Sequence, residues 1–239
     1  MKEMKYYIKK SYPDLNISKT YVVHHRARNY LGSFSELRGS SIDTYLSSFK
    51  YLLKRGYGLI RLTNSSSKKL FFNNNKYIEI NTDFFFNKKL QYYFLLKCKG
   101  FITSSSGPGS IGALLSIPVY ETNIIGPNTF AVTSKSVFIL KKIKFKNKIL
   151  KFKKLLEMGF YNNIFVSSAR VKNLKLKVIN NSSEEILCGL KEFIFLKKIV
   201  KPSQSQVFFK KSLPEYMEHK HYNSNISKSY LSANKNIFN

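Results

Sequence analysis

The sequence is short of several residue types, and each shortage narrows what the protein can do. Of its 239 residues only 13 are acidic, against 41 Lys and Arg, so the formal net charge is +28. The only aspartates are Asp14, Asp43 and Asp83, which leaves no Asp-x-Asp pair to hold Mg²⁺ against a diphosphate and few paired carboxylates for acid–base catalysis. His219 and His221 are close in the sequence, but no third ligand lies near them, so we expect no metal site.

Cysteines and long apolar runs are scarce as well. Cys98 and Cys188 lie in apolar, helix-like segments, which favours buried free thiols in a reducing cytoplasm over a disulfide. Neither these cysteines nor Ser110 stand in a frame typical of an activated nucleophile. No apolar segment follows Met1, and no run approaches the roughly 20 apolar residues that span a bilayer. We therefore expect a cytoplasmic protein that at most contacts the inner face of a membrane.

Lysine supplies nearly all of the positive charge, because only six of the 41 cations are arginines. Such a charge attracts polyanions, including nucleic acid and anionic lipid. Nucleic-acid readers lean on arginine, however, and the joint excess of Lys, Asn, Ile, Phe and Tyr is what an AT-rich coding sequence produces. We therefore attribute the lysine excess to compositional drift rather than to nucleic-acid binding. For the same reason we expect the most basic segment, residues 141–154, to be a solvated surface rather than a membrane-binding segment.

Hydrophobic periodicity alternates between strands and helices from residue 21 to residue 121. Strands are predicted at 21–25, 57–62, 77–80 and on both sides of a Ser/Gly turn in 101–123, with helices at 41–55, 88–98, after the Ser/Gly turn, and at 182–198. Ser40 or Ser41 can cap the first helix, and Gly56 can end it. The order β-α-β-β-α-β-α-β predicts an α/β protein with a Rossmann-like, mainly parallel sheet and helices on both faces.

The Ser/Gly turn in residues 101–123 (FITSSSGPGSIGALLSIPVYETN) is the strongest candidate site. A strand runs into Ser104, Ser105 and Ser106, and a helix begins after Gly107. A helix N-terminus preceded by hydroxyls can cradle an anion, because the first helical amides have no partner within the helix. Residues 107–112 also match the pattern G-x-G-x-x-G. They follow the fourth strand rather than the first, and no acid lies about 20 positions on, so we expect no NAD site.

Four of the six arginines lie at the ends of the first two βα units: Arg26, Arg28, Arg38 and Arg61. In a parallel sheet the ligand crevice lies outside the carboxyl ends of the strands. Because Arg26 and Arg61 come at such ends, both could bind a phosphate through paired hydrogen bonds. The alternative is a surface ion pair, for which the chain has few acids.

Three segments, VVHHR, ELRGSSIDTYLSSFKYLLKRGYGLIRL and FITSSSGPGSIGALLSIPVYETN, resemble a family of bacterial GT-B-type glycosyltransferases from surface-polysaccharide gene clusters. The positions that match the family's motifs are His24, Arg26, Arg38, Ile42, Gly56, Tyr57, Ile60, Arg61, Phe101, Ile102, Ser106, Gly107, Pro118, Thr122 and Asn123. Ser41 and the pair Thr63-Asn64 depart from the family pattern.

The resemblance implies transfer of a sugar from a nucleotide-activated donor to a surface glycan, without a metal and with no cofactor beyond the donor itself. It implies a donor-binding domain at residues 21–200, after an extension at 1–20 and before a helical and polar tail at 201–239. Because the chain turns polar beyond Pro202, we expect its last ~20 residues to fray or dock weakly. The implied donor-binding residues are Arg26, Arg61, Ser105, Ser106, Gly107 and Ser110, with His24, Arg38 and Asn123 as weaker candidates. No catalytic residue is assigned.

Only about 20 residues precede the first strand, whereas a GT-B enzyme has two such domains, so the acceptor-binding half is expected to be absent. Three alternatives stay open: a truncated product, one half of a split enzyme whose second chain supplies the acceptor domain, and a degenerate, non-catalytic copy. A rival from another class is a basic protein that binds nucleic acid or a membrane surface.

Overall fold

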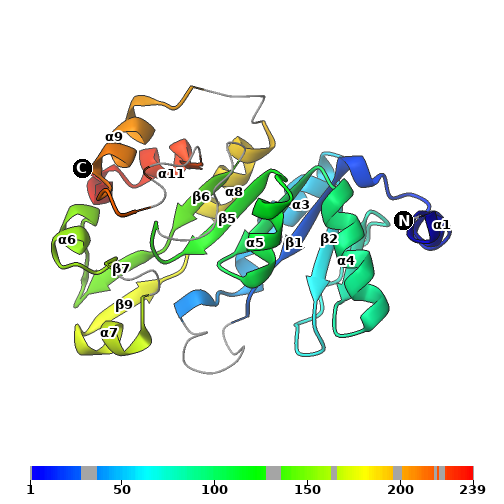
Figure 1. The fold of residues 1–239 in the computed structure, drawn as a ribbon, viewed down its shortest axis with the longest axis horizontal. Helices are drawn as coiled ribbons and strands as arrows, with labels where there is room; N and C mark the ends of the chain where they lie inside the picture. Colours follow the sequence, from blue (N-terminus) through cyan, green and yellow to red (C-terminus); the bar gives the residue numbers. More distant parts are fainter. Residues whose placement is uncertain are drawn as a thin grey trace.

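The computed structural model describes residues 2–27, 37–127, 136–162, 166–195, 201–217, 220 and 224–238. The strands are β1 (Thr20–His24), β2 (Gly58–Thr63), β3 (Tyr77–Asn81), β4 (Gly100–Ser104), β5 (Val119–Ile124), β6 (Val137–Leu140), β7 (Lys142–Phe145), β8 (Lys148–Ile149), β9 (Leu176–Ile179) and β10 (Asn225–Ile226) (Figure 1). The helices are α1 (Lys2–Ser11), η1 (Ile17–Lys19), η2 (Ile42–Tyr45), α3 (Leu46–Lys54), α4 (Phe85–Lys97), α5 (Gly107–Leu114), α6 (Phe152–Glu157), α7 (Ser168–Asn173), α8 (Ser183–Ile194), α9 (Gln204–Ser212), α11 (Lys228–Ala233) and α12 (Lys235–Phe238).

The main sheet has seven strands in the order β10-β6-β5-β4-β1-β2-β3, and every pairing in it is parallel. The chain builds outward from β1 through β2 to β3, then crosses back to add β4 on the other side of β1. The strand order therefore reverses between β1 and β4, as in doubly wound α/β folds. The predicted α/β class and parallel sheet are confirmed.

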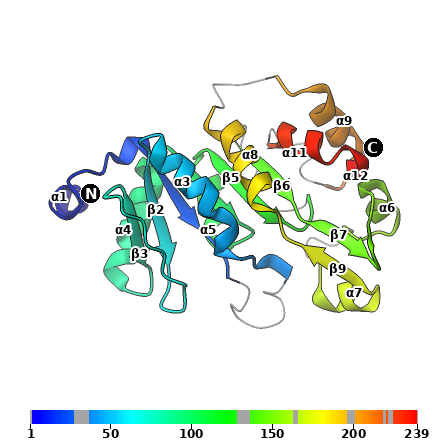
Figure 2. The ribbon, with the colours of Figure 1, turned by 180° about the vertical axis from the view of Figure 1, so that it is seen from behind.

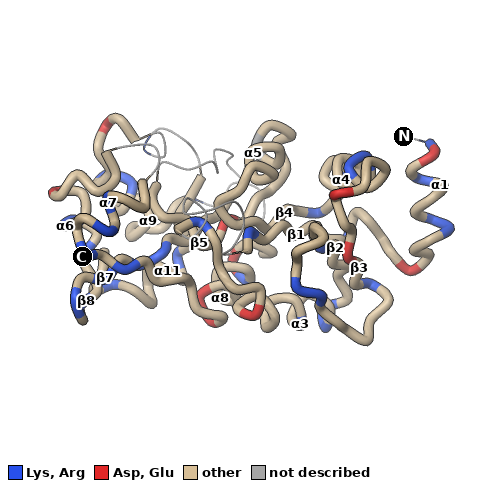
Figure 3. Tube along the Cα trace, turned by 90° about the horizontal axis from the view of Figure 1, so that it is seen from below, with Lys and Arg blue, Asp and Glu red and all other residues tan. Residues whose placement is uncertain are grey.

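Helices cover both faces of this sheet. Helices α4 and α5 lie on one face and α3 and α8 on the other (Figures 1 and 3), and Figure 2 shows α3 and α8 from their own side. Strand β1 is buried on both faces, because Val22 joins one core while Tyr21 and Val23 join the other. At Gly189 in α8 a Cβ atom would collide with the Tyr120 hydroxyl, so glycine lets α8 lie close against β5.

Local signals in the sequence account for several helix ends. The Oγ of Ser41 accepts a hydrogen bond from the Asp43 amide at 3.3 Å, which caps η2 ahead of α3. Gly56 takes a φ of +78° after α3, a conformation that glycine adopts without steric cost. Ser182 and Glu185 form the reciprocal capping box at the start of α8.

A second, smaller sheet of antiparallel strands in the order β8-β7-β9 continues from the end of β6. The expectation of a solvated surface is wrong at Lys141, whose side chain is only 3% exposed. Its ammonium donates to the carbonyl oxygens of Leu37 at 2.6 Å and Gly39 at 2.7 Å, and these acceptors replace the water that a buried cation loses.

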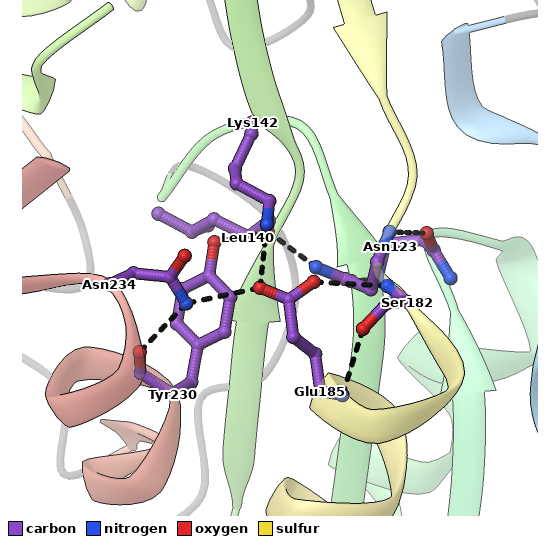
Figure 4. A network of polar contacts seen from close by, with 8 residues as sticks. Asn123, Leu140, Lys142, Ser182, Glu185, Tyr230 and Asn234 are labelled. Carbon is purple, nitrogen blue, oxygen red and sulfur yellow. Dashed lines mark hydrogen bonds and ion pairs between the residues drawn. The ribbon is translucent and has the colours of Figure 1, made fainter. Parts of the chain in front are cut away.

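The C-terminal residues, for which the sequence predicts weak docking, pack into the core. Strand β10 pairs with β6, and Tyr230 of α11 is 1% exposed and donates to the Leu140 carbonyl at 2.7 Å. Figure 4 shows how Glu185 ties these parts together: its carboxylate accepts from Lys142 of β7 at 2.9 Å and from Asn234 at 3.0 Å. The tail is thus held by long-range contacts that its polar composition does not reveal.

Two further expectations concern cysteines and membranes. Both cysteines are free, but Cys188 is exposed and Cys98 is half-buried, so burial was wrongly predicted for Cys188, which lies on the outer side of α8. Among the residues that the structure describes, no helix is both long and apolar enough to cross a bilayer.

Candidate anion site at the carboxyl edge of the sheet

The carboxyl ends of β1 and β4 meet where the strand order reverses. The Nδ1 of His24, the last residue of β1, lies 3.0 Å from the Oγ of Ser106. Two residues further on, the main-chain amide of Arg26 donates to the Oγ of Ser104 at 3.0 Å. The reversal point of a doubly wound sheet is where such folds bind ligands, and here it places the Ser/Gly turn directly beside the end of β1.

The three serines of the turn are interior groups. Ser104, Ser105 and Ser106 are 0%, 3% and 3% exposed, and the Ser106 hydroxyl also lies 3.0 Å from Oγ1 of Thr103. Gly107, by contrast, is exposed, and Ser110 is partly exposed on the first turn of α5. A ligand approaching from solvent therefore meets residues 107–110 first, while the serine hydroxyls hold the turn in shape.

Two arginines flank the turn. The Nε of Arg38 donates to the Ser105 carbonyl at 3.2 Å. Burial lowers the pKa of Arg38, and the charge of Arg26 lowers it further, so the two guanidinium groups lie near enough to repel each other. An anion bound between them would relieve that repulsion and would also face the N-terminus of α5.

Arg61 lies elsewhere in the sheet. Its side chain is 3% exposed, and Nη1 donates to Oε1 of Glu79 at 2.5 Å and to the Lys68 carbonyl at 2.7 Å. The parallel register of β2 and β3 sets Arg61 opposite Glu79, and Tyr77 donates to the same carboxylate. The sequence left an ion pair open as the alternative to phosphate binding, but a surface one, whereas Arg61 in this pair is buried; a donor-binding role for Arg61 gains no support from it. Arg28, His219 and His221 lie outside the described residues.

Both histidines at the end of β1 are neutral near pH 7. Burial, followed by the charge of Arg26, lowers the pKa of His24 to about 4. Burial likewise lowers the pKa of His25 to about 4, and its Nε2 lies 3.0 Å from the Ser40 carbonyl oxygen. A neutral His24 can share a hydrogen bond with Ser106 and adds no charge to the site.

Asn123 at the end of β5 is fully buried and has an unusual backbone. Its φ is +57°, in the left-handed region that asparagine tolerates better than most residues, and β5 shifts register against β6 there. Asn181 holds it from both sides: Oδ1 of Asn181 accepts from the Asn123 amide at 2.7 Å, and the Asn181 amide donates to Oδ1 of Asn123 at 2.9 Å. Asn123 therefore shapes the edge of the sheet from within.

Sequence reasoning missed several polar groups behind the edge. The hydroxyl of Tyr45 lies 2.5 Å from Oγ1 of Thr122 and accepts from Nδ2 of Asn123 at 3.2 Å. Tyr45 carries a polar group on an otherwise apolar helical face, and only the tertiary fold shows which partner it meets. Asn181 and Lys141 were missed for the same reason.

Glu121 is the most unusual of the missed groups. It is 1% exposed, and within the described part of the chain its Oε2 has no hydrogen-bond partner. Burial raises the pKa of Glu121 to about 8, so the carboxyl is mostly neutral at pH 7. It lies beneath α5, where a Cβ on Gly109 would come within 3.1 Å of its Oε1. The missing side chain at Gly109 lets the helix and the carboxyl approach each other.

Comparisons with known proteins give one likeness in structure and none in sequence. No family model matches the chain, and no curated protein matches it. Among solved structures, ADP-heptose LPS heptosyltransferase II from E. coli is similar, with a TM-score of 0.45 and 14% sequence identity over 73% of this chain and 50% of that chain. The chain thus spans about half the length of that enzyme.

Proposed function

We propose that the chain binds a nucleotide-activated sugar at the carboxyl edge of its sheet and acts in glycosyl transfer. The observation that carries the proposal is that Arg26, through its main-chain amide, and Arg38, through its side chain, both contact the Ser/Gly turn that leads into α5, at the reversal of strand order. The motifs around these arginines and the turn resemble those of GT-B glycosyltransferases, which favours a nucleotide diphosphate as the anion.

In the proposed reaction, the bond between the anomeric carbon and the diphosphate oxygen breaks and its electron pair remains on the diphosphate. An acceptor hydroxyl forms the new bond to that carbon and loses its proton. Negative charge grows on the departing diphosphate, and we propose that Arg26, Arg38 and the positive end of the α5 dipole stabilise it without a metal ion. His24 acts as a positioning residue, since it holds Ser106 and thereby the turn.

The direct test is ligand-induced thermal stabilisation with UDP-, GDP-, CMP- and ADP-sugars at about 0.15 M salt, where exposed charges are screened. We expect one nucleotide class to raise the unfolding midpoint. Arg26→Gln and Arg38→Gln should each weaken binding roughly tenfold, because each removes a charge-assisted contact to phosphate. Lys50→Gln makes the same charge change on the exposed side of α3 and should leave binding unaltered.

The outcomes separate three cases. If the folded protein responds to no nucleotide sugar, or if both arginine variants bind as tightly as the parent, the donor site is wrong. If the donor binds but its sugar is neither transferred nor hydrolysed, the chain is a non-catalytic donor-binding protein. Transfer to a glycan acceptor, lost in both arginine variants, would support the full proposal.

A further inference from the structure

The small antiparallel sheet presents a cationic surface that the site above does not use. In register, Lys144 of β7 lies opposite Lys177 of β9 on one side and opposite Ile149 of β8 on the other. Residues directly opposite each other in antiparallel strands point to the same face, so these three side chains share one face. The opposite face packs on the core through Ile143 and Leu176. We call Lys144, Lys177 and Ile149, together with the exposed Lys146 and Lys175 that adjoin the paired residues at the end of the sheet, the lysine face.

The lysine face lies in the most basic part of the chain. Residues 141–180 contain twelve Lys and Arg and a single acid, Glu157, so this sixth of the chain carries more than a third of the net charge. Glu157 pairs with Lys154. Within the described residues, none of the four lysines of the face forms an ion pair. Lysines directly opposite each other repel, and an external anion would remove that penalty. The concentration of blue along β7 and β8 in Figure 3 shows the same asymmetry.

Exposed apolar side chains border these lysines. Ile149, on the lysine face, is 42% exposed. Phe145 lies opposite Leu176 and so belongs to the other face of the sheet, but at the β7–β8 hairpin it is still 38% exposed. The Nζ of Lys146 lies 5.7 Å from the centre of the Phe145 ring. Cations interleaved with exposed apolar groups fit a lipid surface, which offers phosphate charge at its headgroups and an apolar layer just beneath.

Arg170, the one arginine in residues 141–180, is not positioned to bind nucleic acid. Arg170 directs Nη2 at the carbonyl oxygens of Met158 at 3.2 Å and Gly159 at 2.6 Å, inside the fold. Bidentate hydrogen bonds to bases and phosphates are typically made by arginine, whereas lysine is enough for electrostatic attraction to an anionic membrane. The composition of the exposed surface therefore favours lipid over nucleic acid.

The backbone gives a second, independent indication. Lys146, at the hairpin turn, has a φ of +49°, and Lys175, just before β9, has a φ of +51°. The left-handed region disfavours side chains with a Cβ and suits glycine or asparagine. At both positions the chain carries a lysine where a glycine would fit the backbone better, so local stability does not account for these two charges.

We propose that the lysine face, with its exposed Ile149 and the adjoining edge of the sheet at Phe145, docks the protein on an anionic membrane surface. This surface lies on a different sheet from the donor site, and the inference does not depend on the proposed glycosyl transfer.

The first test is co-sedimentation of the full chain with vesicles of phosphatidylcholine alone or with about one-third phosphatidylglycerol. We expect binding only to the anionic vesicles, weakened by salt. Lys144→Gln with Lys177→Gln should lower the affinity roughly 30-fold, since each lysine near such a surface contributes a factor of about five. Lys50→Gln with Lys54→Gln, an equal charge change on exposed positions of α3, is the matched control and should change affinity less than twofold.

A second set of variants separates lipid from nucleic acid and from misfolding. Phe145→Ser with Ile149→Ser should weaken vesicle binding several-fold without changing binding to single-stranded RNA. Lys146→Gly with Lys175→Gly should weaken vesicle binding while the unfolding midpoint stays the same or rises. Equal losses in the two glutamine pairs would overturn the proposal, as would binding to RNA but not to anionic vesicles.

Discussion

The carboxyl edge of the main sheet and the lysine face both carry several cations, but they differ in whether the fold itself supplies partners for those cations. At the edge, the ammonium of Lys141 is buried against the backbone carbonyls of Leu37 and Gly39. On the lysine face, Lys144 and Lys177 lie opposite each other, and among the residues that the structure describes neither pairs with an acid. A buried cation needs an acceptor from the fold itself, whereas an exposed one remains available to an external anion. Where each charge lies therefore says more about function than the net charge of the chain.

The largest expected effect comes from removing a cation that the fold has buried. Arg61→Ala removes the cation that pairs with Glu79 and the donor to the Lys68 carbonyl, in a largely buried setting. We expect the free energy of unfolding to fall by about 4 kcal/mol, measured by urea denaturation. Lys177→Ala on the lysine face should change it by less than about 0.5 kcal/mol. Similar losses in the two variants would remove the distinction between the two surfaces.

A slightly smaller loss of stability is expected when a neutral contact at the edge, between Asn181 and Asn123, is removed. Asn181→Ala removes the acceptor of the buried Asn123 amide and the donor to the Leu140 carbonyl. Because an unsatisfied buried amide is costly, unfolding should become easier by about 3 kcal/mol. Asn173→Ala, at the exposed end of α7, is the matched control and should be close to neutral. If Asn181→Ala is also neutral, the left-handed backbone of Asn123 does not depend on this contact.

Much of the fold could be predicted because its signals are local. The capping box of Ser182 and Glu185 and the glycine stop at Gly56 depend on residues a few positions apart, and the structure confirms both. The partners of Arg61 and Lys141 depend on strand register and on chain segments 18 to 104 residues away, which periodicity does not report. Sequence reasoning thus brought the right segments to the candidate site but misjudged which of their side chains are buried.

A third prediction concerns how stability depends on pH, because Glu121 is a buried acid at the same edge of the sheet. Its pKa is about 8 in the fold, and an unfolded glutamate ionises near pH 4.5. Between these values the unfolded state binds fewer protons than the folded state, so stability falls as pH rises and levels off above about pH 8. From pH 6.5 to 9 the loss should be about 2 kcal/mol.

This loss should vanish in Glu121→Gln, which cannot ionise, and persist in Glu184→Gln, whose side chain is exposed. His24 and His25 are neutral in the folded state across this range, and their titration in the unfolded state near pH 6.5 is common to the parent and both variants, so it cancels in the comparison. The measurement is the free energy of unfolding of each variant across the range. Parallel pH profiles for Glu121→Gln and the parent would show that the carboxyl is ionised, or has a partner, in the fold.

The smallest expected effect is a gain, not a loss, in the free energy of unfolding, and it concerns a residue of the lysine face. Lys175→Gly removes a side chain from a residue with a φ of +51°, which relieves backbone strain but gives the unfolded chain more freedom. The two terms nearly offset, and we expect a net gain of about 0.5 kcal/mol in urea denaturation. Lys172→Gly, within helix α7, makes the same substitution without that strain and should cost about 1 kcal/mol. A loss for Lys175→Gly as large as that for Lys172→Gly would mean that the Lys175 side chain stabilises the fold. Its charge would then belong with the buried cations of the edge rather than with those left for an external anion.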